Sequence, residues 1–69
     1  MKKTYYAKGL LEWQVALKHN GIVLRLCFSG GSMGSNGVIP ARYETDNPVI
    51  QRIIEGSDYF KEKRIYTTN

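Results

Sequence analysis

The chain has few of the residues that usually cross-link a very small protein. Its 69 residues include one cysteine, Cys27, and one histidine, His19. A disulfide within the chain needs a second cysteine, and a structural zinc site needs a cage of Cys and His ligands, so the sequence predicts neither. The fold must therefore depend on packing, or gain part of its stability from a partner.

Long apolar segments are also missing. A secretory signal would need about 7 to 15 apolar residues after the N-terminal lysines, and Lys8 and Glu12 interrupt any such run. No segment approaches the roughly 18 apolar residues of a membrane span. We therefore expect no signal peptide and no membrane partner, and the cytoplasm is the expected compartment.

The overall composition is that of a small folded domain. Hydrophobic residues make up 42% of the chain and aromatic residues 12%, which argues against disorder. The length predicts one domain that spans residues 1–69. Ten Lys and Arg against six Asp and Glu give a net charge of +4. This modest charge permits an anionic partner without requiring one.

The strongest local pattern predicts a β-hairpin from Leu11 to Phe28. Apolar residues occupy odd positions before Asn20-Gly21 and even positions after it. Asn-Gly is a preferred centre of the type I′ turn, in which both residues take a positive φ. Such a turn brings the apolar residues together on one face, with Trp13 opposite Phe28, Val15 opposite Leu26, and Leu17 opposite Leu24.

The other face of this hairpin is mixed in character. Polar and charged residues share it with Ala16, Val23 and Cys27. Two interpretations remain open: a solvent-exposed face, or a face that another chain covers through this modest apolar strip.

Residues 29–37 are dominated by glycine and serine. Four Gly and three Ser make up seven of these nine residues. A run of this kind has high backbone entropy and few anchoring side chains, so we expect a mobile loop unless a partner orders it. The glycine spacing fits neither a phosphate-binding P-loop nor a dinucleotide fingerprint, because the lysine of the first and the spacing of the second are absent.

The same segment contains one match to a catalytic motif. Gly30-Gly31-Ser32-Met33-Gly34 has the letters of the nucleophile elbow of α/β hydrolases. That elbow joins a strand to a long helix, and Pro40 lies too close for such a helix to follow. His19 also precedes the serine, which reverses the order of the triad. We therefore predict no enzyme, no catalytic residue, no cofactor and no metal site.

The C-terminal half predicts a strand, a helix and a final strand. The alternation from Val38 to Thr45, with Pro40 near its start, predicts a third strand at about 41–45. Asp46 or Asn47 would cap a helix over about 48–55, with Pro48 in its first turn and Gly56 at its end. The helix carries an apolar stripe of Val49, Ile50, Ile53 and Ile54, which should pack on the apolar face of the hairpin.

Together these elements predict an α+β fold. Ser57 should begin a further capped turn, and Ile65-Tyr66 suggests a last short strand. The predicted architecture is a small antiparallel sheet of three or four strands with one short helix packed on one face.

The step from the third strand into the helix carries a family resemblance. The residues concerned are Thr45-Asp46-x-Pro48, then Val49-Ile50-Gln51-x-Ile53-Ile54-Glu55-x-Ser57-x-x-Phe60, and the basic exit Arg64-Ile65. This layout, after a short hairpin, resembles small virion-associated proteins of tailed bacteriophages encoded beside head and neck genes. The resemblance covers roughly positions 10 to 66. It implies a structural role on a larger protein shell, and a location in the virion or the host cytoplasm.

We therefore expect an interaction protein that binds other chains of a larger assembly, copies of itself included. Ordering a flexible loop costs roughly 1 to 2 kcal/mol per residue, so a sizeable interface should form where the loop is ordered. The predicted partner-binding residues are Tyr5, Tyr6, Gly31, Ser32, Met33, Ser35 and Asn36.

The alternative is a small nucleic-acid-binding protein. In that case lysines and arginines would combine with exposed aromatic side chains into a basic stacking surface. The residues available for it are Lys2, Lys3, Lys8, Lys18, Arg25 and Arg42 with Tyr5, Tyr6 and Trp13. Acidic residues spread along the chain make this the less favoured of the two partners.

Overall fold

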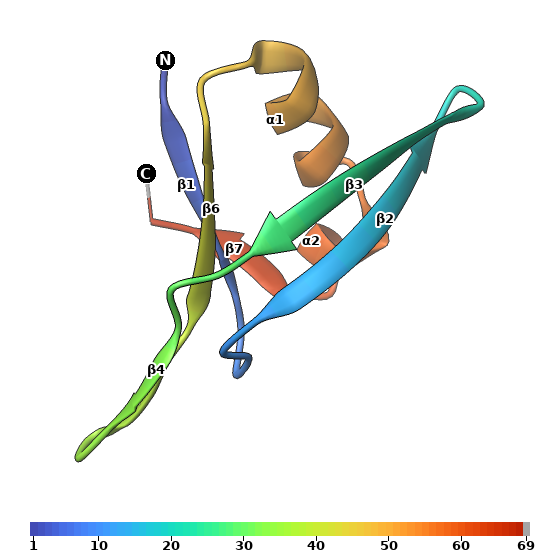
Figure 1. The fold of residues 1–69 in the computed structure, drawn as a ribbon. Helices are drawn as coiled ribbons and strands as arrows, with labels where there is room; N and C mark the ends of the chain where they lie inside the picture. Colours follow the sequence, from blue (N-terminus) through green and yellow to red (C-terminus); the bar gives the residue numbers. More distant parts are fainter. Residues whose placement is uncertain (69) are drawn as a thin grey trace.

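Figure 1 shows the computed structural model of the chain, which describes residues 1–68. Six short strands are followed by two short helices and a last strand. In chain order they are β1 (Lys3–Ala7), β2 (Trp13–His19), β3 (Ile22–Phe28), β4 (Ser32–Gly34), β5 (Gly37–Ile39), β6 (Ala41–Thr45), α1 (Pro48–Glu55), α2 (Asp58–Lys61) and β7 (Ile65–Thr67). The expected α+β class is confirmed in this broad sense.

The strands of residues 1–68 form three small antiparallel sheets. One has the order β6-β1-β7, the second is the hairpin β2-β3, and the third is the hairpin β4-β5. The prediction of a single sheet with three or four strands was therefore wrong in its connectivity. An isolated bridge between Ser29 and Arg42 links the end of the β2-β3 hairpin to β6.

The β2-β3 hairpin is confirmed in its turn and its register. Asn20 has φ 52° and Gly21 has φ 80°, the positive values that a type I′ turn requires. The three expected apolar pairs form as predicted, with Trp13 opposite Phe28, Val15 opposite Leu26 and Leu17 opposite Leu24. The first strand begins at Trp13, two residues later than expected.

Strand β1 was not predicted, and it lies at the centre of the three-stranded sheet. Tyr5 and Ala7 point into the core and are both 0% exposed, whereas Tyr6 between them is half-buried. Tyr5 therefore offers no side-chain surface to a partner, which corrects its place among the predicted contact residues. A tyrosine and an alanine supply this buried face, so the segment lacks the aliphatic alternation that marks a strand.

Helix α1 has the predicted bounds, and Asn47 rather than Asp46 is its cap. The Asn47 side chain accepts hydrogen bonds from the backbone N–H of Val49 at 2.9 Å and of Ile50 at 3.4 Å. Ser57 caps the short helix α2 in the same manner through the N–H of Phe60. Neither of these helices of residues 1–68 is long and apolar enough to cross a membrane.

The core lies where the hairpin, the three-stranded sheet and the helices meet (Figure 1). Its buried members come from β1, β2, β3, β6, α1 and β7: Tyr5, Ala7, Val15, Leu17, Leu26, Phe28, Ala41, Ile54 and Ile65. Only Ile54 of the predicted helix stripe is fully buried, and Val49 is 58% exposed. The stripe is therefore narrower than expected, and other elements also contact the hairpin: β6 packs beside β3, and Tyr59 of α2 meets the ring of Trp13.

A polar contact joins β1 to the end of α1. The Tyr5 hydroxyl donates to Glu55 Oε2 at 2.6 Å, and Lys3 Nζ lies 3.0 Å from the same oxygen. The Tyr5 hydrogen bond, followed by that of Lys3, holds the pKa of the Glu55 carboxyl below its usual range. Burial, together with the hydrogen bond to Glu55, raises the pKa of Tyr5.

Replacing Phe28 tests the packing of the core. Phe28 is fully buried between the rings of Trp13 and Tyr43, so Phe28→Ala should cost about 3 to 5 kcal/mol. That equals the whole stability expected of a domain this small, so the variant should be unfolded in near-UV circular dichroism. Val23→Ala, on the outer face of the same strand, should cost less than about 1 kcal/mol. Similar urea midpoints for the two variants would contradict this packing.

The pH dependence of stability tests the Tyr5–Glu55 contact. A carboxyl whose pKa is lowered by folding adds stability at pH values above its unfolded pKa, and this is lost as the pH falls through the folded pKa. Tyr5→Phe should therefore lower the free energy of unfolding by about 1 kcal/mol at pH 7 and by less at pH 3. Tyr43→Phe is the control, since Tyr43 does not bond to Glu55. An equal effect of Tyr5→Phe at both pH values in urea melts would refute the contact.

Candidate interaction surface

The glycine- and serine-rich segment contains a projecting hairpin rather than an irregular loop. Strands β4 and β5 pair with Ser32 opposite Ile39, Met33 opposite Val38 and Gly34 opposite Gly37. Figure 1 shows this hairpin, called the arm here, extending away from the body beyond β6. It contributes to the elongated shape of the chain, whose principal extents are 42 × 23 × 18 Å.

Backbone hydrogen bonds fix the base of the arm. The Gly31 N–H donates to the carbonyl of Leu11 at 3.2 Å, and the Ala41 N–H donates to that of Leu10 at 2.8 Å. Just beyond, Ser29 and Arg42 exchange two backbone hydrogen bonds of 3.1 and 2.8 Å. The turn after β1 therefore holds both strands at the point where the arm leaves the body.

Gly31 is required at this base because the backbone of Leu11 passes very close to it. A Cβ atom at position 31 would lie 2.6 Å from the Leu11 Cα and 2.7 Å from its carbonyl oxygen. Backbone atoms cannot move aside as a flexible side chain can, so any other residue would displace the segment. At Gly34, inside the arm, the nearest atom to such a Cβ would be 3.7 Å away.

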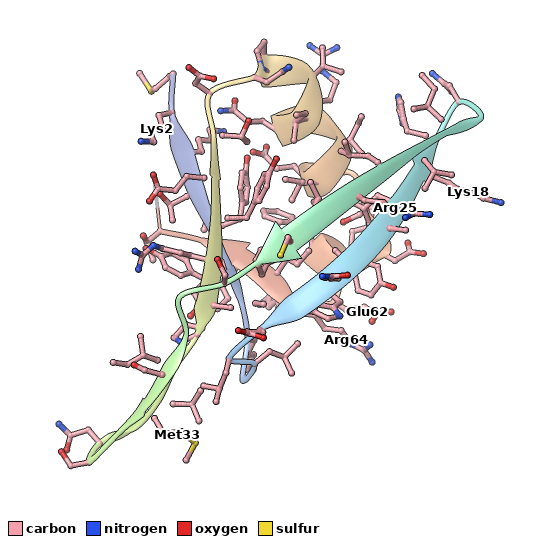
Figure 2. All side chains as sticks on the ribbon, in the orientation of Figure 1. Lys2, Lys18, Arg25, Met33, Glu62 and Arg64 are labelled. Atoms are coloured by element: carbon pink, nitrogen blue, oxygen red, sulfur yellow. The ribbon has the colours of Figure 1, made fainter. Side chains whose placement is uncertain are left out.

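The arm exposes apolar side chains. Met33 is 72% exposed, Ile39 55% and Val38 43%. Because partners across an antiparallel pair share a face, Met33 and Val38 lie on one side of the arm and Ile39 on the other. Figure 2 shows Met33 pointing outward from the arm, away from the body. Leu10 and Leu11 add further exposed apolar surface at the base.

The structure brings most of the predicted contact residues into one unit. Gly31 lies at the base of the arm, Ser32 and Met33 lie in β4, and Ser35 and Asn36 form its tip. Tyr5 is in the core, as described above. Tyr6 lies apart from the arm, with its ring stacked on Tyr66 of β7 at a centroid distance of 5.3 Å. The predicted loop residues therefore lie together in the arm, whereas Tyr5 and Tyr6 lie outside it.

Sequence reasoning missed the apolar residues that belong to this surface. Val38 and Ile39 follow the glycine-rich run and resemble the start of the next strand, so nothing local assigned them to a separate hairpin. The signal that could have identified them is the Ser35-Asn36 pair between two glycines, which is typical turn composition. Pro40 then separates β5 from β6.

The arm carries no charged side chain, and several charges of the body are in ion pairs. Ion pairs link Lys2 and Arg42 with Glu44 at 3.0 and 3.7 Å, and Lys3 with Glu55 at 3.0 Å. No charged residue occurs between positions 26 and 41. Among residues 1–68 there is also no group of three or more His, Cys, Asp and Glu that could hold a metal ion. The arm can therefore offer apolar contact and backbone hydrogen bonds, and no charge.

Comparisons of the chain with protein-family models, with curated proteins and with solved structures find no match. The surfaces of the chain itself are therefore the indication of what it binds.

Proposed function

We propose that this chain is a structural interaction protein whose arm binds another protein chain. The observation that supports the proposal is the exposure of Met33, Val38 and Ile39 on a narrow hairpin that leaves the body. Small soluble domains usually expose apolar side chains singly, and a concentration of them often marks a contact surface. The closely packed base at Gly31 would present this surface in a defined direction.

The arm also has backbone groups suited to a partner sheet. Within residues 1–68, β4 and β5 pair only with each other, so each strand has an outer edge without a strand beside it. An exposed edge can add a strand from another chain, with backbone hydrogen bonds for affinity and side chains for specificity. Met33 and Val38 on one face would then insert between the partner's side chains.

The partner that we propose is a larger protein assembly. The resemblance of the strand-to-helix step to small virion-associated proteins of tailed bacteriophages supports a phage shell or neck as that assembly, with the chain located in the virion. An uncharged apolar arm fits a groove on such a protein better than it fits a strongly anionic surface.

The basic stacking surface considered from the sequence has less support. Its aromatic members Tyr5 and Trp13 belong to the core or pack against it. Three of its six cations, Lys2, Lys3 and Arg42, lie in ion pairs with carboxylates. Binding through that surface would therefore require these contacts to open.

Photo-crosslinking from the arm tests the proposal. A photoreactive phenylalanine analogue placed at Met33, in cells that also produce the proteins of neighbouring genes, should crosslink to a larger protein chain. The same analogue at Val23, an exposed residue on β3, should not. Val38→Ser should reduce the crosslinked fraction roughly tenfold when the partner concentration is well below saturation. A valine buried in the interface contributes about 1.5 kcal/mol or more to the free energy of binding.

A second variant separates the position of the arm from its chemistry. Gly31→Ala should displace the base and lower crosslinking from Met33, whereas Gly34→Ala meets no close backbone atom and should leave it nearly unchanged. Crosslinks to nucleic acid, equal crosslinking from Val23, or no effect of Val38→Ser would each contradict the proposal.

A further inference from the structure

A second feature, separate from the arm, is a hollow beside β7. Its volume is about 530 Å³, within the range of small-molecule sites. Phe60 of α2 and Ile65 and Tyr66 of β7 form its apolar part. The remaining lining residues are Lys8, Lys61, Lys63 and Thr67. Lys63 takes a φ of 63°, and this reversal of the chain places α2 and β7 on two sides of the hollow.

The hollow is positively charged. Three lysines line it and no acidic residue does. None of the three forms an ion pair with a carboxylate of residues 1–68. Glu62, which lies between Lys61 and Lys63 in the chain, instead pairs with Arg64 at 3.3 Å, and Figure 2 shows these two side chains close together. An anionic ligand among these lysines would therefore not have to displace an internal carboxylate from them.

An aromatic ring is held at the same place. Tyr66 lines the hollow, and Tyr6 stacks on it at 5.3 Å with an angle of 26° between the ring planes. Tyr6 itself is not a lining residue. One face of Tyr66 is thus occupied by Tyr6, so a ligand ring could stack only on the opposite face. A planar ligand ring placed there would form the third layer of a stack.

We infer that this hollow binds a nucleotide unit, with the base against Tyr66 and the phosphate among Lys8, Lys61 and Lys63. Lysine binds phosphate as a point charge, and three of them can balance its two negative charges. The apolar wall formed by Phe60 would exclude water from one side of the base. The unit could be a free nucleotide or the end of a single strand, which share this chemistry.

An extended acidic peptide fits the hollow less well. Such a peptide would bind by adding a strand to the outer edge of β7. Ile65, the first residue of β7, is only 1% exposed, so the backbone there is already covered. Lysines at a sheet edge can also protect it from pairing with other strands. That role alone would require neither a hollow nor an aromatic ring stacked on a second one.

Titration of the isotope-labelled full chain with adenosine monophosphate tests the inference. Backbone amide shifts should concentrate at Lys8 and residues 60–67, and adenosine monophosphate should bind more tightly than adenosine or inorganic phosphate. Tyr66→Leu should weaken binding about tenfold and Tyr66→Phe should retain it. Lys61→Gln should weaken binding about two- to fivefold. Lys18→Gln, on β2 outside the hollow, is the matched control and should have no effect.

A further titration identifies the source of the ligand, and several results would overturn the inference. A ten-residue oligothymidylate with a 5′-phosphate that binds more tightly than thymidine monophosphate would assign the hollow to a strand end, and equal binding would assign it to free nucleotides. The inference is overturned by shifts that concentrate away from Lys8 and residues 60–67, by equal effects of Lys61→Gln and Lys18→Gln, or by tighter binding of a Glu-Tyr-Glu peptide. If Tyr66→Leu does not fold, the lysine pair still decides the outcome.

Discussion

The burial of Tyr5 in the middle of β1 is the contact on which the rest of the structure depends. Its ring is fully buried and meets the edge of Phe60 from α2, while its hydroxyl donates to Glu55 at the end of α1. Its backbone lies between β6 on one side and β7 on the other. A chain without a disulfide has no covalent alternative, so this one side chain connects the sheet to both helices. The cost of burying a phenolic hydroxyl is offset by a hydrogen bond to a carboxylate, which is stronger than one to a neutral group.

The position of β1 also determines where the arm points. The turn that follows β1 supplies the carbonyls of Leu10 and Leu11, and these receive the N–H groups of Ala41 and Gly31. A glycine-rich hairpin of three-residue strands would be marginal by itself in water. The turn after β1 holds the base of the arm, so only the outer part of the arm must become ordered through its own contacts. The backbone entropy that argued for a mobile loop is thus reduced by contacts from Leu10 and Leu11, a segment far earlier in the chain.

The sequence predicted the elements whose signals are local, and failed where the signal lies elsewhere in the chain. The register of β2 with β3 follows from the apolar parity on either side of Asn20-Gly21, and the bounds of α1 follow from its caps and Pro48. Strand β1 left little trace, because Tyr5 and Ala7 are not the aliphatic residues that reveal a buried face. The five contact candidates from Gly31 to Asn36 were located by composition, yet Val38 and Ile39 became part of the same surface only through pairing. No local pattern could show that Gly31 faces Leu11.

Strand β1 lies between two surfaces of different character, the uncharged arm and the lysine-lined hollow. It bonds to β6, which leads from the uncharged arm, and on its other side to β7, which borders the basic hollow. Lys2, Lys3 and Arg42 on the first side are neutralised by Glu44 and Glu55, so the positive charge near β6 is low. On the second side Glu62 pairs with Arg64, and within residues 1–68 none of the three lysines of the hollow forms an ion pair with a carboxylate. The placement of a few carboxylates therefore separates an uncharged apolar surface from a lysine-lined one on a sheet only three strands wide.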